Sequence, residues 1–258
     1  MKDKEGKIEQ AKICVISYPN SGRTWLRVLL GKALCDQYGL GEHFRFIFDS
    51  LKVTAAAGLP TMDYTHDGTR LSQAKHFEDL ETDKSRYQDK KVILLLRDPR
   101  DLVVSCYFQA SRMRNLYEGS LSDFIRDDHY GIRKIVTFYD IWHAHRHVPE
   151  AFLVLRYEEM HADPAGSLRL VLDFMGAPLL DDGVVAKAVE YASFDNMKKM
   201  EQDGYFASEK IKTGRPGDEE SYKVRRGKVD GYVDYLSPED CQYLDAVTQE
   251  LGCAFFAK

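Results

Sequence analysis

The amino-acid sequence predicts an α/β protein with a parallel central sheet flanked by helices and a P-loop-like turn after the first strand. Short β-rich apolar runs alternate with longer segments whose apolar residues recur at helical spacing. The clearest run, 91–96, is apolar without alternation, which is typical of a parallel strand covered on both faces. We therefore expect ligands to bind at the carboxyl ends of the strands.

The elements follow in order from these patterns. The run 12–17 is β-rich and passes through a Gly-containing turn into a helical segment, whose apolar residues share one face: Trp25, Val28, Leu29 and Ala33. A helix starts where the strand at 91–96 breaks, with Pro99 in its first turn. Strands are expected at 12–17, near 61–65, at 91–96 and at 151–155. Helices are expected at 23–34, from Pro99 onward, and at about 131–146, 164–175, 181–191 and 237–251.

The last helix carries its own start signal, because Ser237 is a capping residue followed by Pro and two acids. Before it, residues 203–236 are rich in Gly and charge and show little periodicity. A loop this long in a compact domain is usually functional or disordered. No repeat or linker divides the chain, so residues 1–258 are expected to form one domain.

Composition bounds the classes of function. A chain of 258 residues with 44% hydrophobic residues can bury a large core, which excludes a disordered protein. The formal net charge of −5 argues against a general binder of nucleic acid or anionic membranes. A strongly anionic ligand would therefore need positive charge that the fold gathers locally.

Cysteines and apolar runs indicate the compartment. The five cysteines include no CxxC pair, which favours free thiols in a reducing cytosol and no zinc site. The N-terminal residues are charged, and the strongly apolar run 92–96 is far too short to span a bilayer. We predict a soluble cytoplasmic protein without a membrane span or a bound metal.

A first candidate anion site lies at 18–25, where a strand joins a helix N-terminus with free backbone N–H groups. Gly22 allows close approach of a ligand to the backbone. Gly22-Arg23-Thr24 is similar to the end of a Walker A loop, but Ser17 stands where that motif has its first Gly. An ordinary strand–helix turn is the alternative.

Two further basic segments could contact the same anion. Arg97 ends a buried strand, and Ser105 follows about two helical turns later on a similar face. The alternative is a helix-terminal salt bridge between Arg97 or Arg100 and Asp98 or Asp101. Farther along, the segment 222–228 (YKVRRGK) is mostly basic and contains Gly227. A solvated charge run is the usual interpretation of such a segment.

The motifs resemble those of the cytosolic-type sulfotransferases that use PAPS (3'-phosphoadenosine 5'-phosphosulfate), and they occur in the same order along the chain. The family's YPKSGTTW is YPNSGRTW here, and its RNPRDxxxSxY is RDPRDLVVSCY. A Tyr-Glu-Glu-Met step follows at 157–160, a Ser-Phe-x-x-Met-Lys segment at 193–198, and RRGKVDGYV stands for RKGxxGDWK. The resemblance covers about residues 12 to 240.

The resemblance implies the cofactor and the residues that bind it. PAPS would be the donor and 3',5'-ADP (PAP) the product, with no metal required. The 5'-phosphosulfate would lie against Ser21, Gly22, Arg23, Thr24 and Trp25. The 3'-phosphate would be held by Arg97, Ser105, Arg225, Arg226 and Gly227. The adenosine would lie between Trp25, Tyr157 and Phe194, although core packing is the more frequent use of such rings.

His66 is the predicted general base. The family places a His six residues after a Pro, in the pattern P-R-x-x-K-T-H, and Pro60 stands six residues before His66. A His titrating near neutral pH can take the proton of an attacking hydroxyl. His76, in a Lys-His step, is the weaker alternative. The histidines 143, 145 and 147 are expected on a solvated helix face.

The first loop departs from the family in one important residue, because Asn20 replaces the Lys that contacts the leaving phosphate oxygen. Asn can hydrogen-bond but cannot neutralise developing charge. We hypothesise that Arg23 supplies that charge and count Asn20, Arg23 and His66 as the catalytic residues. Tyr64 replaces another family Lys, and the family's C-terminal dimer motif is missing, so the oligomeric state stays open.

The predicted function is transfer of a sulfuryl group from PAPS to a hydroxyl or amine of a small-molecule or glycan acceptor. A P-loop-like ATP-dependent kinase and a catalytically impaired PAPS- or PAP-binding module are the alternatives. Aromatic residues could line the acceptor site or equally belong to the core: Phe44, Phe46, Phe48, Tyr107, Phe108, Tyr117, Tyr205 and Phe206.

Overall fold

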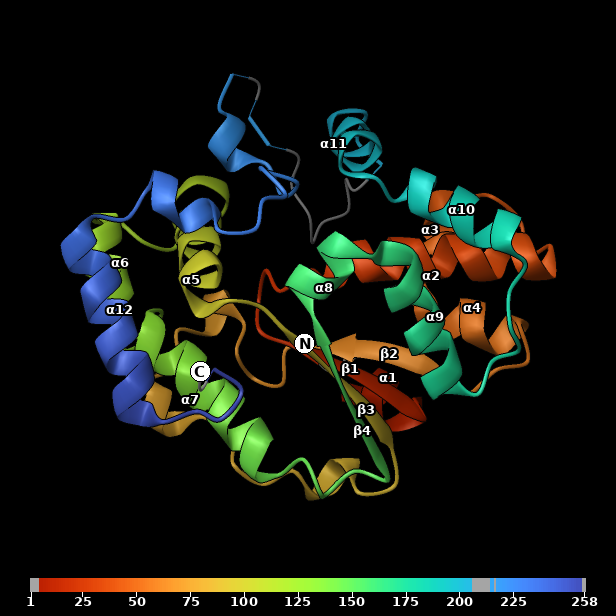
Figure 1. Cartoon of the computed structure of the whole chain (residues 1–258), viewed down its shortest axis with the longest axis horizontal. Coiled ribbons are helices and arrows are strands. Elements are labelled where there is room, and N and C mark those ends of the chain that lie inside the picture. Colours follow the sequence, from red (N-terminus) through yellow and green to blue (C-terminus); the bar gives the residue numbers. More distant parts are fainter. Residues whose placement is uncertain (1–4, 206–213, 216, 257–258) are drawn as a thin grey trace.

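A computed structural model describes residues 5–205, 214–215 and 217–256 (Figure 1). Its sheet has four parallel strands in the order β2-β1-β3-β4. Their bounds are Ile13–Ser17 for β1, Met62–Thr65 for β2, Lys91–Leu96 for β3 and Ala151–Arg156 for β4. The predicted parallel α/β architecture and all four predicted strands are confirmed.

The strands of this sheet end side by side. At the ends of the strands, Ile16 lies opposite Thr65, Ser17 lies opposite Leu95, and Leu96 lies opposite Arg156. Segments that follow the four strands therefore emerge at one edge of the sheet. β1 is followed along the chain by its neighbour on one side, β2, and then by β3 on the other side. The gap between β1 and β3 is thus the topological switch point, where ligands of open α/β sheets bind.

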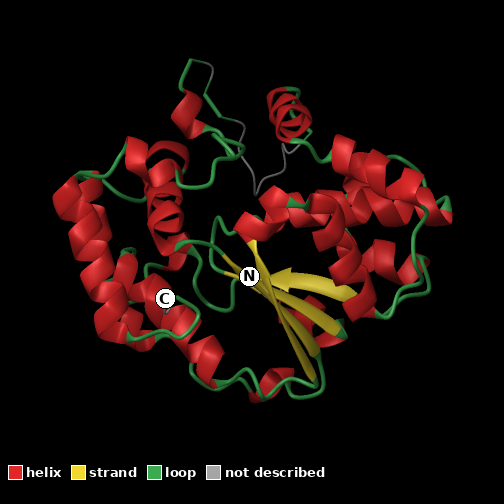
Figure 2. Ribbon diagram, viewed as in Figure 1, coloured by secondary structure: helices red, strands yellow, loops and turns green. Residues whose placement is uncertain are grey.

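Helices cover both faces of the sheet (Figure 2). The side chains of the sheet alternate between two apolar layers. On one face, Cys14 and Ile16 pack with helices α5 (Pro99–Phe108), α7 (Ile132–Ala144) and α12 (Pro238–Leu251). On the other face, Ile13 and Val15 pack with α2 (Arg23–Tyr38), α9 (Pro164–Met175) and α10 (Asp182–Tyr191). The sheet is covered on both faces, as its unbroken apolar strands predicted.

The helix start signals read from the sequence are also seen. Ser237 caps α12 by accepting a hydrogen bond from the Asp240 N–H, and Pro238 occupies the first turn. Asp98 caps α5 in the same way through the Arg100 N–H. The structure adds short elements that are too brief for periodicity to predict. They are α1 (Glu5–Gln10), α3 (Phe44–Ile47), α4 (Ser50–Ala56), α6 (Leu121–Arg126), α8 (Tyr157–Ala162), α11 (Phe194–Gln202) and a π-helical turn (Gln109–Met113).

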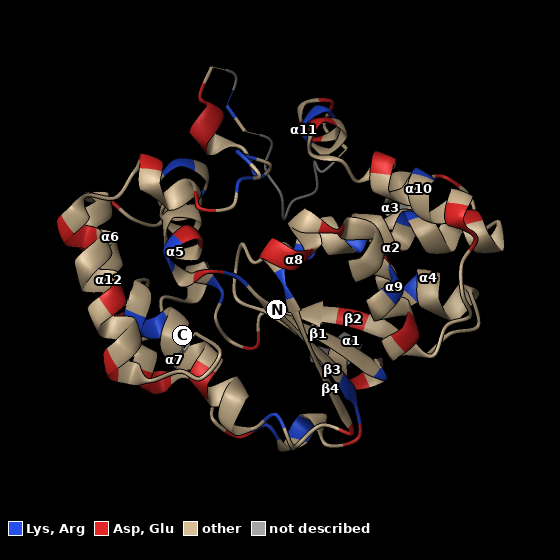
Figure 3. Cartoon of the chain, viewed as in Figure 1, with Lys and Arg blue, Asp and Glu red and all other residues tan. Residues whose placement is uncertain are grey.

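The remaining expectations concern membrane-spanning helices, the cysteines, the distribution of acidic residues and the segment 203–236. None of the helices in the described part of the chain is long and apolar enough to cross a membrane. All five cysteines are free thiols, and four of them are buried. Acidic residues are spread along helix α12 (Figure 3). Between residues 203 and 236, the structure describes only two short 3₁₀ turns, Glu219–Ser221 and Gly231–Asp234.

Candidate active site

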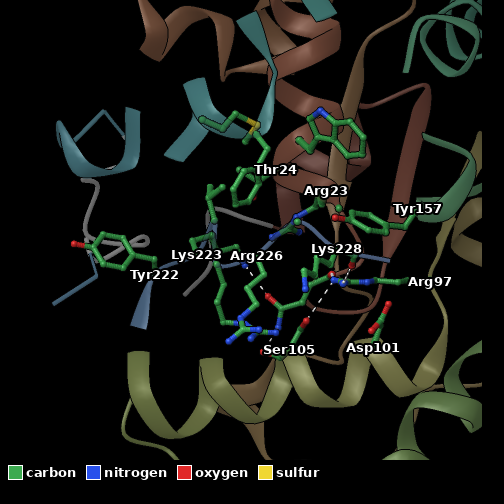
Figure 4. A pocket seen from close by; sticks show the side chains of 18 of the residues that line it. Arg23, Thr24, Arg97, Asp101, Ser105, Tyr157, Tyr222, Lys223, Arg226 and Lys228 are labelled. Carbon is green, nitrogen blue, oxygen red and sulfur yellow. Dashed lines mark hydrogen bonds between the residues drawn. The ribbon is translucent and has the colours of Figure 1, made fainter. Parts of the chain in front are cut away.

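A cavity of about 280 Å³ lies at the carboxyl edge of the sheet (Figure 4). Residues that follow each of the four strands line it, together with α11 and the loop before α12. The fold brings together every predicted site residue except Ser21. The predicted residues that line the cavity are Asn20, Gly22, Arg23, Thr24, Trp25, His66, Arg97, Ser105, Tyr157, Phe194, Arg225, Arg226 and Gly227.

The first loop joins β1 to α2 and presents a helix N-terminus to the cavity. Gly22 is the N-cap residue at φ 95°, and no side chain caps α2 there, so its first backbone N–H groups are available to an anion. A Cβ on Gly22 would lie 2.8 Å from the ring of Tyr157, so the chain needs glycine here. The Ser21 hydroxyl instead lies in the core, 3.0 Å from the Tyr18 carbonyl oxygen and 3.0 Å from the Tyr139 hydroxyl.

Arg97, at the end of β3, connects three segments of the cavity wall. Its Nη1 donates to the Asn20 carbonyl oxygen at 3.0 Å and to the Ser105 hydroxyl at 3.4 Å, and Nη2 donates to the Lys228 carbonyl oxygen at 3.4 Å. The guanidinium lies 4.2 Å from the centre of the Tyr157 ring. Its Nε is buried and finds no partner in the described chain, so a donor group remains for a ligand.

The helix-terminal salt bridge that was the alternative for the RDPRD segment is present, and it is formed by Arg100 and not by Arg97. Asp98 forms its ion pair with Arg100 at 2.8 Å, and this leaves Arg97 free to face the cavity. Asp101, which sequence reasoning missed, also lines the cavity and accepts a hydrogen bond from the Tyr232 N–H at 2.8 Å. Burial raises the pKa of its carboxyl group, although Arg97 opposes this shift.

His66 directly follows β2, and its ring has a defined orientation. Nδ1 lies 2.8 Å from the Ser17 carbonyl oxygen, which can only accept, so Nδ1 carries the proton and Nε2 holds a lone pair. Burial lowers the pKa of His66 well below its ordinary value, and the nearby Arg23 lowers it further. The ring is therefore neutral near pH 7 and can accept a proton at Nε2.

The segment after His66 is fixed by a buried network that the sequence did not reveal. Asp67 accepts hydrogen bonds from Lys84 Nζ at 2.8 Å, the Tyr87 hydroxyl at 2.8 Å and Trp142 Nε1 at 3.1 Å.

The alternative base, His76, lies away from the cavity and its Nε2 is 3.7 Å from an Asp128 carboxylate oxygen.

The loop before α12 brings the predicted arginines to the cavity, but each already has a carboxylate partner. Arg225 contacts Glu220 at 2.8 Å and lies 4.5 Å from the centre of the Phe108 ring. Arg226 contacts Asp234 at 3.0 Å. Gly227 adopts φ 61° and lies so close to Phe194 that a Cβ would come within 2.4 Å of the ring. This segment is a paired basic cluster rather than a solvated charge run.

Besides Arg97, two cations in the cavity lack a carboxylate partner among the described residues. Arg23, in the first turn of α2, and Lys223, in the loop before α12, have no carboxylate within ion-pair distance among the described residues. Burial, reinforced by the charge of Arg27, lowers the pKa of Arg23 to about 9. Burial and the charge of Arg23 lower the pKa of Lys223 to about 8. Lys223 belongs to the basic segment 222–228, and the sequence alone predicts no role for it.

Of the aromatic residues suggested for an acceptor site, Phe108 lines the cavity, next to Gln109 and Met113 of the π-helical turn. The others that the structure describes pack elsewhere: Phe44 stacks on Phe48, and Tyr107 and Tyr117 pack around Phe124. Phe206 lies outside the described residues. No cluster of three His, Cys, Asp or Glu residues that could hold a metal occurs in the described part of the chain.

Comparison with known proteins identifies related chains. A family model described as "Sulfotransferase domain" matches residues 10–253. Cytosolic sulfotransferase 16 of Arabidopsis thaliana is 27% identical over 92% of this chain and 74% of its own length. Sulfotransferase 2A2 of Rattus norvegicus is 27% identical over 96% of this chain and 86% of its own length.

Solved structures share the fold. Retinol dehydratase in complex with androsterone and PAP superposes with a TM-score of 0.64 at 19% identity, covering 95% of this chain and 82% of the other. A mouse sulfotransferase complexed with PAP gives a TM-score of 0.61 at 21% identity, covering 97% of this chain and 90% of the other.

Proposed function

The chain belongs to the sulfotransferase domain family and is a sulfotransferase, and on that premise we propose that its donor is PAPS and that His66 is its general base. The observation that carries this proposal is the arrangement at the switch point. There, a helix N-terminus, Arg97 and the His66 ring line one cavity. The PAP in the related crystal structures supports the choice of donor.

The residues present fit a phosphorylated nucleotide. Arg97 has an unpaired buried Nε, and the backbone of Gly22 lines the cavity at a position where a Cβ would collide with the Tyr157 ring. We propose that Gly22 to Trp25 hold the 5'-phosphosulfate and that Arg97 and Ser105 hold the 3'-phosphate, with Arg225, Arg226 and Gly227 contributing to the same subsite. Trp25, Tyr157 and Phe194 lie where rings could enclose the adenosine.

When bound, PAPS supplies the sulfuryl group: a bond forms between its sulfur and the acceptor atom, the bond from sulfur to the 5'-phosphate oxygen breaks, and that oxygen keeps the electron pair. His66 accepts the acceptor's proton at Nε2, while Ser17 keeps the other ring nitrogen protonated. The α2 N-terminus and Arg23 place positive charge in the same cavity. Alignment and charge complementarity supply the rate.

Arg23 is proposed as a catalytic cation. Arg23→Ala is expected to lower turnover more than it weakens nucleotide binding, because developing charge is larger in the transition state than in the ground state. Equal turnover in the variant and the wild type would remove this role.

We propose a small molecule with a hydroxyl or amine as the acceptor. Related proteins carry names that point to such compounds, among them a flavonol 3-sulfotransferase of Flaveria bidentis and retinol dehydratase crystallised with androsterone. A glycan acceptor stays a prediction from the sequence. The names of the relatives also favour the cytosol, and we propose that location and a single domain over residues 1–258.

The central test is calorimetric titration with 3',5'-ADP and with ATP, followed by radiolabelled sulfuryl transfer from PAPS to a panel of phenols, alcohols and amines. We expect tighter binding of 3',5'-ADP and labelled product. Preference for ATP would favour the kinase alternative. Binding of 3',5'-ADP without turnover of any acceptor, in the wild type and in Asn20→Lys alike, would favour the binding module.

A further inference from the structure

We propose that Lys223 supplies the cation for the departing 5'-phosphate oxygen, and that Asn20 is the residue that holds its ammonium group in place. This inference rests on the proposed function. It assigns a second cation, in addition to Arg23, to a residue that lies about 200 positions farther along the chain.

The position of Lys223 carries the first step. Its Nζ donates a hydrogen bond to Asn20 Oδ1 at 3.0 Å and lies in the cavity that Gly22, Arg23 and His66 also line (Figure 4). The ammonium group therefore sits beside the side chain of residue 20, the position from which the family's lysine acts.

The amide of Asn20 is suited to hold a cation and not to contact an anion. Its Nδ2 donates to Gln109 Oε1 at 2.9 Å and to the Ser105 carbonyl oxygen at 3.2 Å. These acceptors fix the orientation of the amide, so Oδ1 is the atom that faces Lys223. Asn20 also adopts φ 71°, a conformation that asparagine tolerates better than most residues.

The backbone of Lys223 is anchored independently of its side chain. Glu201, a buried residue of α11, accepts hydrogen bonds from the N–H groups of Lys223 and Val224, both at 2.7 Å. Because both ends of the lysine are held, its ammonium group needs little reorganisation to meet an anion.

The charge of Lys223 is available to a ligand. The neighbouring Arg225, Arg226 and Lys228 each have a carboxylate within ion-pair distance, whereas Lys223 has none among the described residues. A partly buried cation without a counter-ion is costly, and a phosphate oxygen in the cavity would relieve that cost. The groups that face the ammonium are Asn20, Arg23, Cys106, Arg114, Glu201 and His66.

The test compares Lys223→Met with the double variant Asn20→Lys/Lys223→Met, which moves the lysine from position 223 to position 20. Lys199→Met, on the exposed face of α11, is the matched control. We expect Lys223→Met to lower kcat about 100-fold, the typical effect of removing one preorganised donor to a developing anion. The double variant should recover at least about tenfold of that loss, because it restores a cation beside the same oxygen. Lys199→Met should leave kcat unchanged.

A second readout does not require turnover. Calorimetry of 3',5'-ADP binding at pH 8 in two buffers of different ionisation enthalpy measures proton uptake. Because the pKa of free Lys223 is about 8, the wild type should take up about half a proton when the phosphate binds. Lys223→Met should take up less, and Lys199→Met should match the wild type.

The outcomes separate the two proposals. If the wild type binds 3',5'-ADP and transfers sulfuryl groups while Lys223→Met matches it in kcat and in proton uptake, the assignment of Lys223 is wrong and the proposed function stands. Should the double variant fold but fail to recover turnover, the assignment is also wrong. If the wild type prefers ATP to 3',5'-ADP, the proposed function itself fails.

Discussion

The loop after β1 and the loop before α12 line the same cavity but are held in different ways. The first loop owes its shape to the backbone, with Gly22 at φ 95° and Asn20 at φ 71° next to an uncapped helix N-terminus. The loop before α12 depends on side-chain ion pairs with Glu220 and Asp234 and on the buried Glu201. The loop after β1 is thus held by its backbone conformation, and the loop before α12 is held by ion pairs that a bound anion could replace.

This difference indicates what each wall contributes. A phosphate site made of backbone N–H groups changes little when the ligand leaves, because the groups are fixed by the fold. A site made of arginines that already hold carboxylates must exchange partners as the ligand arrives. We therefore expect substitutions in the segments that directly follow the strands to have larger effects on binding and turnover than substitutions in the loop before α12.

The largest effect on turnover is expected for His66→Ala, in the segment that directly follows β2. Loss of the general base should lower turnover by about 10³-fold, within the usual range for a positioned acid or base. Binding of 3',5'-ADP should change little, since His66 is proposed to contact the acceptor. Steady-state kinetics with PAPS and calorimetry measure the two quantities. His76→Ala is the control and should behave like the wild type, and equal losses in both variants would contradict the role of His66.

A matched pair of glycines compares the two walls directly. Gly22→Ala places a methyl group against the buried Tyr157 ring at φ 95°, whereas Gly227→Ala meets the more exposed Phe194, which can move. Strain of about 1–2 kcal/mol for a left-handed residue applies to both variants, and only in Gly22→Ala does the clash add to it. We expect the affinity for 3',5'-ADP to fall at least about 30-fold in Gly22→Ala and about tenfold in Gly227→Ala. Calorimetric titration of both variants measures this. A larger loss in Gly227→Ala would reverse the comparison.

The pH dependence of kcat/KM involves both walls. His66 must be neutral, and its lowered pKa keeps it so well below pH 6.5. Lys223 must be protonated, and its charge is lost as pH rises through about 8. We expect a plateau from pH 6.5 to about 8 and a fall approaching tenfold per unit above it. In Lys223→Met, the fall above pH 8 should be absent, because the titrating ammonium group has been removed; an unchanged profile would contradict this.

The smallest effect should come from removing a competing carboxylate. Glu220→Gln frees Arg225 from its partner, so the affinity for 3',5'-ADP should rise about two- to fivefold, the usual worth of a partly exposed ion pair. Glu219→Gln, which removes an exposed partner of Lys198, is the control. Weaker binding in Glu220→Gln would mean that the carboxylate positions Arg225 rather than competing for it.

Strand-borne features could be predicted from the sequence because they depend on local pattern. The apolar run 91–96 and Arg97 immediately after it place that side chain at the edge of the sheet. His66 follows the strand expected near 61–65, but its role as a base is inferred from the family resemblance. The position of Lys223 could not be predicted, since a basic segment does not indicate which of its cations meets Asn20. The carboxylate partners of Arg225 and Arg226 and the network around Asp67 are likewise products of tertiary packing.

The hydrogen bond between Asn20 and Lys223 spans 203 positions of sequence. During synthesis, the sheet and the first loop can form from residues that leave the ribosome early, but the cation at residue 223 is added near the end. Contacts of such long range close late in folding, because a large loop must be ordered first. A nascent or truncated chain would hold the first loop without its partner. Turnover, which is proposed to need Lys223, therefore depends on the folding of the C-terminal part of the chain.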